Sequence, residues 1–251
     1  LIYFLALGVA AFIAWTVQSE IDELARARGQ IVTVARTQLV QSVQDGVVAE
    51  ILVQEGQRVK KSELLIRLDQ SRSMAAYDDS RNKVAALKAT LARLHSEVYH
   101  TPLQFPADLK AYPAFRENQQ RLYYARKQSL DQGVNALEQS RKLVRDELKI
   151  TEPLLSMGEV GQAEVIRLKR QESELHGQIM NLRNKFFQDA QAEMTKAEED
   201  LAAQEQLLEE RTVTLRQTEL RAPADGVIRK IIVTTVGAAV RNGEIIMEML
   251  P

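Results

Sequence analysis

Side chains that carry chemistry are sparse in this chain of 251 residues, and their spacing fits no catalytic or metal site. His95 and His100 are five residues apart, not the four that place two metal ligands on one helical face, and His176 is remote from both. Cysteine is absent, which excludes a thiolate metal site and a disulfide framework. The sequence also lacks a G-x-x-x-x-G-K-[ST] phosphate loop and a G-x-S-x-G nucleophile turn. We therefore expect no enzymatic activity, no metal and no cofactor.

The charge pattern does not predict a nucleic-acid partner. The net charge is −1, and 33 Lys and Arg residues are dispersed among 34 Asp and Glu residues without a basic patch. A charged fraction of 27 % with 5 % aromatic residues is typical of long solvated helices rather than of a thick globular core.

Two short stretches, about 180 residues apart, repeat one pattern. Residues 45–66 read DGVVAEILVQEGQRVKKSELLI, and residues 225–247 read DGVIRKIIVTTVGAAVRNGEIIM. The turn positions of the repeat are Asp45, Gly46, Gly56, Asp225, Gly226 and Gly237. Neither half can bury an apolar face alone, because isolated hairpins are marginal in water. The repeat predicts one small β-sandwich built from two distant halves.

Between the two halves the apolar period becomes helical. Apolar residues step by three and four over 84–98, which is typical of a seam that faces a partner helix. Prolines break the pattern near residues 100–113, and the seam then resumes until Pro153, next to a tip near residues 152–162. The last helical stretch shifts its phase once, near Phe186. At the rise of an α-helix each arm is roughly 85–100 Å long, and each arm stabilises the other.

The chain opens on an apolar run without charge. Residues 1–17 read LIYFLALGVAAFIAWTV, which is near the short end for crossing a bilayer. A signal-peptide core is the alternative, but no small-residue cleavage pattern precedes Gln18, which favours an uncleaved membrane anchor. The anchor residues singled out are Leu5, Leu7, Phe12 and Trp15.

The predicted fold class is mainly α with a small all-β domain. We expect a transmembrane anchor at 1–17, a linker at 18–38 with a first strand at 31–34, half-motifs at 39–69 and 218–251, and an α-helical hairpin at 70–217.

Two segments carry a family resemblance. They are residues 38–69, QLVQSVQDGVVAEILVQEGQRVKKSELLIRLD, and residues 218–229, TELRAPADGVIR. The repeated pattern in them, a DGxV turn, a strand, a glycine-containing turn and a closing strand, resembles the half-domains of lipoyl and biotinyl carriers. In carriers, a tight hairpin with a modified lysine joins the two halves. In this chain the helical insertion takes the place of that hairpin. Lys60 and Lys61 lie within the first half, before the junction, and are expected to be surface charges. With the anchor and the hairpin, the whole chain resembles the haemolysin D-type membrane fusion proteins, which are periplasmic adaptors of type I secretion. The resemblance implies a split lipoyl-like, or barrel-sandwich hybrid, domain with an antiparallel helical hairpin inserted.

The resemblance also implies a function. The chain would be a single-pass protein of the bacterial inner membrane with its bulk in the periplasm, self-associated as a hexamer. It would link an ABC transporter to a TolC-like outer-membrane channel, so that a large polypeptide such as an RTX toxin or adhesin crosses both membranes. The tip residues expected to contact the channel are Leu154, Leu155, Met157, Gly158, Val160 and Gly161. Alternatively, the tip leucines only close the coiled coil.

Three further alternatives stay open. The same scaffold could serve a tripartite drug-efflux pump, although Ile150 and Gly161 stand where efflux adaptors carry the arginine and serine of an Arg–Leu–Ser tip pattern. A lipoyl or biotinyl carrier subunit of an enzyme is the second alternative. A soluble coiled-coil chaperone is the third, and it requires cleavage of residues 1–17.

Overall fold

A computed structural model describes residues 2–19, 26 and 37–251. The chain divides into two units, Leu1–Arg36 and Thr37–Pro251, and each is described by itself. The first unit holds helix α1 (Ile2–Gln18). Among the described residues, no helix has both the length and the apolar character that crossing a membrane requires. The strand expected at residues 31–34 lies outside the described residues.

The second unit begins with a β-sandwich of two four-stranded antiparallel sheets. The first half of the repeat forms β1 (Gln38–Gln41), β2 (Gly46–Ile51), β3 (Arg58–Val59) and β4 (Leu64–Leu68). The second half forms β5 (Glu219–Arg221), β6 (Gly226–Ile231), β7 (Ala239–Val240) and β8 (Ile245–Leu250). The strand orders are β1-β8-β6-β3 and β5-β4-β2-β7, so each sheet takes two strands from each half. The prediction that the distant halves form one body is confirmed.

Equivalent aspartates of the repeat cap turns in opposite halves. Asp45 Oδ1 accepts a hydrogen bond from the backbone N–H of Asn242 at 2.8 Å. Asp225 Oδ1 accepts one from the backbone N–H of Lys61 at 2.7 Å. Each half therefore completes a turn of the other half.

The glycines of the repeat show the same exchange. Gly56 N–H donates to the carbonyl of Ile228, and Gly237 N–H donates to the carbonyl of Val48, both at 2.8 Å. The two glycines have φ angles of 83° and 88°, a left-handed conformation that side chains with a Cβ rarely adopt. The repeat conserves these residue types in its two copies because both turns have the same backbone geometry.

The sandwich core is apolar and drawn from both halves. Leu65 and Ile66 of β4, with Ile246 and Met247 of β8, are fully buried in one cluster. Burying a side chain of this size stabilises the fold by roughly 1.5–3 kcal/mol. This shared core is what neither half could form alone.

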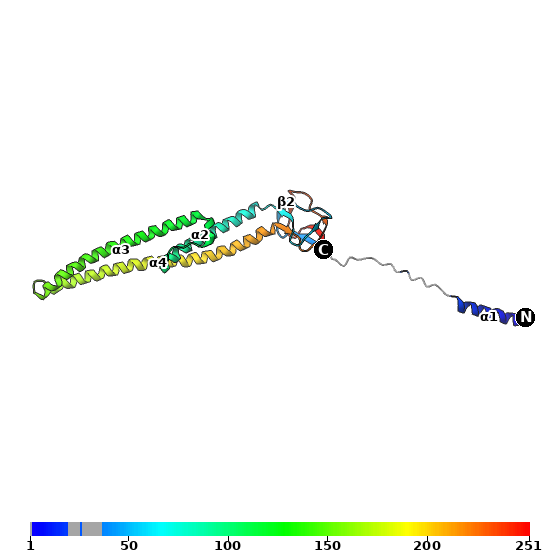
Figure 1. The fold of residues 1–251 in the computed structure, drawn as a ribbon, viewed down its shortest axis with the longest axis horizontal. Coiled ribbons are helices and arrows are strands. Elements are labelled where there is room, and N and C mark those ends of the chain that lie inside the picture. The colour runs from blue at the N-terminus through cyan, green and yellow to red at the C-terminus, as the bar shows by residue number, and fades with distance from the viewer. Residues whose placement is uncertain (1, 20–25, 27–36) are drawn as a thin grey trace. The chain divides into compact units, whose positions relative to one another are not determined.

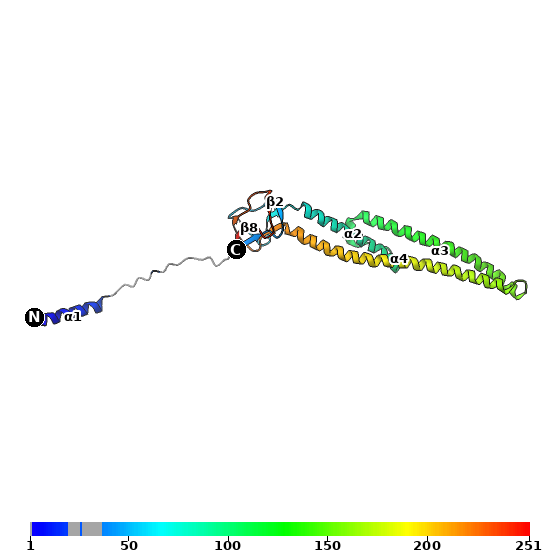
Figure 2. The ribbon, with the colours of Figure 1, turned by 180° about the vertical axis from the view of Figure 1, so that it is seen from behind.

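The helical insertion folds back on itself between the two halves of the repeat (Figures 1 and 2). It contains α2 (Ser71–Tyr99), the short 3-10 helix η1 (Ala107–Ala111), α3 (Pro113–Ser156) and α4 (Gln162–Gln217). Both α2 and α3 pack against α4. At about 1.5 Å per residue, α4 alone is about 84 Å long. The predicted fold class, mainly helical with a small β-sandwich, is confirmed for the part of the chain described.

Helix α4 changes its partner along its length. Near the hairpin tip, Val144 and Leu148 of α3 pack with Leu168 of α4. Nearer the sandwich, Leu94 of α2 packs with Met194. The change of partner explains the phase shift that the sequence shows near Phe186.

Gly226 and Gly46 are equivalent in the repeat but differ in the space around them. A Cβ at Gly226 would overlap the backbone carbonyl oxygen of Leu250, whereas a Cβ at Gly46 would meet the end of the Leu68 side chain, not backbone, at 3.0 Å. We expect Gly226→Ala to lower the free energy of unfolding by about 1–3 kcal/mol. Gly46→Ala is the matched control and should cost clearly less in the same denaturant titration. Equal losses at the two positions would contradict this packing.

Candidate functional site

The candidate site is the turn at the far end of the hairpin, where α3 gives way to α4. Gly158 N–H donates to the carbonyl of Leu155 at 3.1 Å, and Glu159 N–H donates to that of Leu154 at 3.0 Å. Gly158 has a φ of 79°. This pair of bonds with a left-handed glycine is a Schellman cap, which satisfies the last carbonyl groups of a helix.

The seam was expected to stop at Pro153 and the glycines that follow, with a tip near residues 152–162, and α3 ends within that range at Ser156. Proline in the last turn removes only its own N–H bond, and the cap beyond it supplies partners for the exposed carbonyl groups. Gly161 then occupies the N-cap position of α4 with an extended backbone.

The predicted contact residues divide into two groups. Met157 is 70 % exposed, and Gly158 and Gly161 are also exposed. Leu154, Leu155 and Val160 are half-buried, and Leu155 packs on the apolar cluster beneath the tip. Of the predicted contact residues, a partner can therefore reach the Met157 side chain and the backbones of the two glycines, next to the exposed side chains of Ser156 and Glu159.

The tip stands on a tightly packed end of the coiled coil. Val165 and Leu168 of α4 are buried against α3. Outside this core, Lys169 forms an ion pair of 2.8 Å with Glu152 across the two helices. These contacts fix the position of the turn relative to both arms.

A buried charge network lies where α2, α3 and α4 meet. The side chains of Arg93 and Glu97 in α2 are only 3 % and 2 % exposed, and they are joined by a hydrogen bond of 2.8 Å. Arg93 also donates to Gln119 of α3 at 2.8 Å and to Glu193 of α4 at 3.2 Å. A single guanidinium thus joins three helices.

Arg126 of α3 completes the network. Its Nη1 donates to Glu193 at 2.9 Å, and its Nε lies 3.5 Å from the second carboxylate oxygen of Glu97. Its guanidinium also lies over the ring of Phe186, 5.4 Å from the centroid. The network holds the start of α3 against the end of α2, so the far part of the hairpin is aligned with the part rooted in the sandwich.

The charged network was not among the residues singled out from the sequence, although a signal was present. Arg93 and Glu97 are four residues apart on one helical face, and they adjoin Leu94 and Val98 in the apolar seam. Two opposite charges at this spacing, next to residues of a buried seam, indicate a buried ion pair, because a charge is tolerated in the interior when an opposite charge is paired with it.

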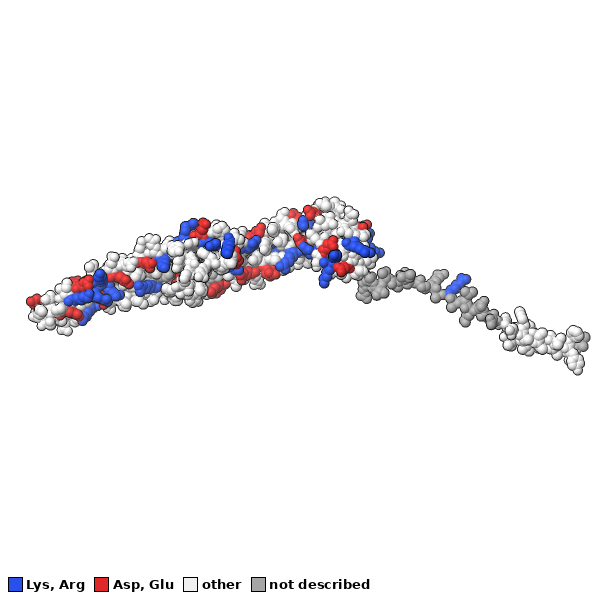
Figure 3. All heavy atoms as spheres, in the orientation of Figure 1, with Lys and Arg blue, Asp and Glu red and all other residues white. Residues whose placement is uncertain are grey.

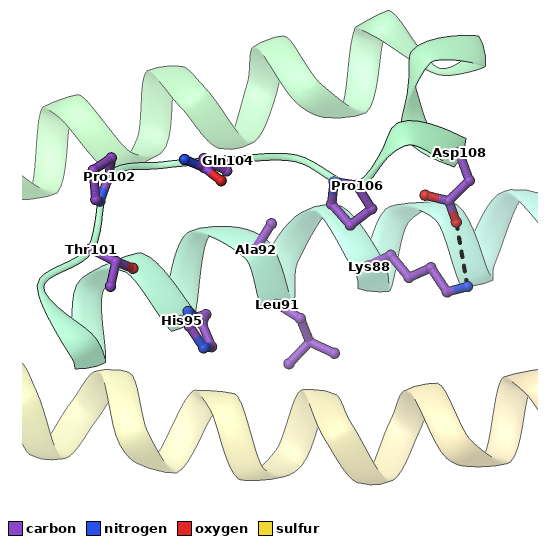
Figure 4. Close-up of a pocket in the computed structure, with 9 residues that line it drawn as sticks. All are labelled: Lys88, Leu91, Ala92, His95, Thr101, Pro102, Gln104, Pro106 and Asp108. Carbon is purple, nitrogen blue, oxygen red and sulfur yellow. Dashed lines mark hydrogen bonds and ion pairs between the residues drawn. The ribbon is translucent and has the colours of Figure 1, made fainter.

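The connection between α2 and α3 folds back along α2 and leaves an open groove of about 730 Å³ (Figure 4). Leu91, Ala92 and Pro106 give the groove its mostly apolar lining. At its edge Lys88 pairs with Asp108 at 3.4 Å and with Glu205 of α4 at 3.2 Å. In the described part of the chain, no group of three His, Cys, Asp or Glu side chains could hold a metal ion.

The remaining residues singled out from the sequence lie away from the tip. Lys60 and Lys61 are exposed in the turn between β3 and β4. Leu5, Leu7, Phe12 and Trp15 are exposed on α1. Along the hairpin, acidic and basic side chains are interspersed (Figure 3).

Comparison with known proteins identifies the family. Residues 36–249 match the family described as CzcB-like, barrel-sandwich hybrid domain, and the chain belongs to this family. The solved soluble domain of LipC, a membrane fusion protein of a type I secretion system, has the same fold. The TM-score is 0.66 at 20 % identity, and the match covers 86 % of this chain and 100 % of the solved soluble domain of LipC.

Two curated relatives belong to secretion systems. The type I secretion system membrane fusion protein PrsE of Rhizobium meliloti is 27 % identical, over 98 % of this chain and 68 % of PrsE. The alkaline protease secretion protein AprE of Pseudomonas aeruginosa is 23 % identical, over 97 % of this chain and 68 % of AprE. The resemblance to membrane fusion proteins of type I secretion is confirmed.

Removing Arg93 should destabilise the hairpin strongly. Arg93→Ala leaves the Glu97 carboxylate buried without its main partner, which costs about 3–5 kcal/mol. Lys83→Ala is the control, because Lys83 pairs with Asp79 on the surface of the same helix and such pairs contribute about 0.5 kcal/mol or less. Thermal unfolding followed by circular dichroism compares the two. A similar small loss in both variants would show that the network contributes little.

The network should also make stability depend on pH. Burial raises the pKa of the Glu193 carboxyl, but hydrogen bonds from Arg126 and Arg93 outweigh burial and hold the pKa below its ordinary value of 4.5. A carboxyl with a lowered pKa stabilises the fold above that ordinary value, and the contribution disappears as pH falls through the folded-state pKa. We expect melting temperatures below pH 4.5 to fall less steeply in Glu193→Gln than in the unchanged chain. Parallel pH profiles would contradict the role of Glu193.

Proposed function

We propose that this protein is a non-enzymatic adaptor of a type I secretion system. It links an ABC transporter of the inner membrane to a TolC-like channel of the outer membrane. A large secreted protein, such as an RTX toxin or adhesin, is the proposed cargo. The energy for export comes from ATP hydrolysed by the transporter. The adaptor holds the transporter and the channel at a fixed distance from each other.

The observation that carries the proposal is a long helical hairpin with an exposed apolar tip and a fixed root. Both arms enter the sandwich on neighbouring strands, β4 and β5, which pair antiparallel. At the other end Met157 offers a large apolar side chain to a partner. A hairpin that is fixed to the sandwich at one end and binds a partner at the other can hold that partner at a defined distance from the sandwich.

The names of the relatives favour protein export over drug efflux. PrsE is named as a type I secretion membrane fusion protein, and AprE is named for secretion of alkaline protease. A leukotoxin secretion protein of a Pasteurella haemolytica-like strain is also similar, at 23 % identity over 99 % of this chain and 63 % of that protein. These names support a protein cargo.

The proposal includes the location and the assembly of the chain. Residues 1–17 are assigned the role of inner-membrane anchor, with the sandwich and the hairpin in the periplasm. Several copies, six by family resemblance, surround the path of the cargo. The tip residues Met157, Gly158 and Gly161 are assigned the contact with the channel, and the half-buried Leu155 closes the coiled coil.

The tip assignment is tested by crosslinking in the native envelope. A photo-crosslinking residue in place of Met157 should capture the outer-membrane channel, and one in place of Thr195 on the exposed side of α4 should not. Met157→Asp should reduce secretion because it places a charge in an apolar contact, whereas Thr195→Asp should leave secretion unchanged. Capture of only neighbouring adaptor copies at Met157 would overturn the assignment.

A further inference from the structure

Helix α3 carries a second seam, with exposed apolar residues among small and polar ones, outside its contact with α4. Leu143 and Ile150 are 72 % and 69 % exposed, and Leu122 is 39 % exposed. These residues share one register of seven, which also includes the exposed Ser129 and Ala136. The α3 seam, with the intervening positions three residues further on, consists of Leu122, Ala125, Ser129, Gln132, Ala136, Gln139, Leu143, Asp146 and Ile150.

Helix α4 carries a matching seam on its own outer side. Ile166, Met180 and Phe187 are 48 %, 41 % and 43 % exposed, and they share one register of seven with Ser173. The α4 seam consists of Ile166, Arg170, Ser173, Gly177, Met180, Asn184 and Phe187. Apolar residues repeated every seven positions are the pattern by which one helix packs on another. The core of the hairpin uses other positions, so in residues 37–251 neither seam has a helix packed on it.

A glycine in the α4 seam points to a close neighbour. Glycine in a helix interior costs about 1 kcal/mol relative to alanine, so it requires a packing reason. Gly133 of α3 has one, because an added Cβ would lie 3.0 Å from Leu182 of the same chain. Gly177 has none among the residues that the structure describes, since an added Cβ would meet nothing within 4 Å there. The space at Gly177 is available to a side chain from outside.

The two seams match when copies of the hairpin stand side by side at the same height. Contacts within the chain set the level, because Gly133 lies against Leu182 and Arg145 bonds to Glu172 at 2.8 Å. On that level Ala136 of one copy faces Met180 of the next. Similarly, Ser129 faces Phe187, and Leu143 faces Ser173 beside Gly177. Large side chains thus meet small ones at these three levels, as close packing requires. At the level nearest the tip Ile150 faces Ile166, so two exposed apolar side chains meet there.

The charges of the seams are complementary as well. Each seam contains one charged residue, Asp146 on α3 and Arg170 on α4, and they lie at the same level to within a residue. Asp146 forms an exposed ion pair of 3.0 Å with Lys149 one helical turn further on, a type of contact that contributes little. A carboxylate and a guanidinium are therefore available to pair between copies.

We propose that the α3 seam of one copy packs on the α4 seam of the next copy. Because the seams are different surfaces on opposite sides of one hairpin, the contact is head-to-tail and can repeat around a closed ring. The inference rests on the proposed function in one respect, namely that all copies are rooted at the same height.

The absence of cysteine makes the contact directly testable. The variant Ala136→Cys with Met180→Cys should form disulfides between copies of the full chain in the native envelope, giving a ladder of dimers, trimers and larger species. Neither single substitution should give crosslinks, because Ala136 faces Met180 and not itself. Dimers formed by Ala136→Cys alone would instead show that like seams meet.

The matched control moves each cysteine by one residue onto another face. Asn135→Cys with Asn181→Cys has the same level and both positions are exposed, but it should form no ladder. In the crosslinking variant, Arg170→Asp or Asp146→Arg alone should lower the yield several-fold, and the two together should restore it. An absent ladder, or an equal ladder from the control, overturns the seam pairing. Channel capture at the tip is read separately, so a ladder without capture would count against the proposed function alone.

Discussion

Strand pairing between the two halves of the repeat is the interaction on which the hairpin depends. The arms leave and re-enter the sandwich on β4 and β5, which come from different halves and pair directly. At the same root Leu68 N–H donates to the carbonyl of Thr218 at 2.8 Å, and the Gln70 amide donates to the Thr218 hydroxyl at 2.9 Å. An antiparallel coiled coil alone would fix the arms relative to each other. The shared sandwich also fixes them relative to the body that carries them.

In the middle of the hairpin, two shorter helices, α2 and α3, must together form one arm opposite the continuous α4. The chain breaks between α2 and α3, and only α4 is continuous. The Arg93 network holds the ends of the broken arm together on the surface of α4. A buried ionic group is costly unless each charge is paired, so it tolerates only the arrangement in which all partners are in place. Together with the apolar contacts of α2 and α3 on α4, the network fixes the two shorter helices along α4 and so sets the reach of the tip.

The repeat and the periodicity made most of the architecture predictable. Asp45 and Asp225 revealed the split sandwich because both turns use the same capping interaction, and the heptad spacing revealed the paired arms. The phase shift near Phe186 was visible, but its cause required knowing that α4 changes partner there. The tip was placed near residues 152–162, but the Schellman cap at Gly158 was not predicted, because it depends on backbone hydrogen bonds that residue types do not specify. The outward seams were missed as well, since a residue such as Leu143 cannot be assigned to the inner or outer face of a helix before its partner is known.

Amide hydrogen exchange across the sandwich tests the central claim most directly. If each half is held only by the other, the amides that cross between halves, Gly56 and Gly237, open in one cooperative event. Residue-resolved exchange should then give both amides the same opening free energy, equal to that of the strand amides in β2 and β6. Persistent protection of the amides in one half, while those of the other half exchange freely, would contradict the account. One half of the sandwich would then be folded without the strands of the other half, and pairing between the halves would not be what fixes the hairpin.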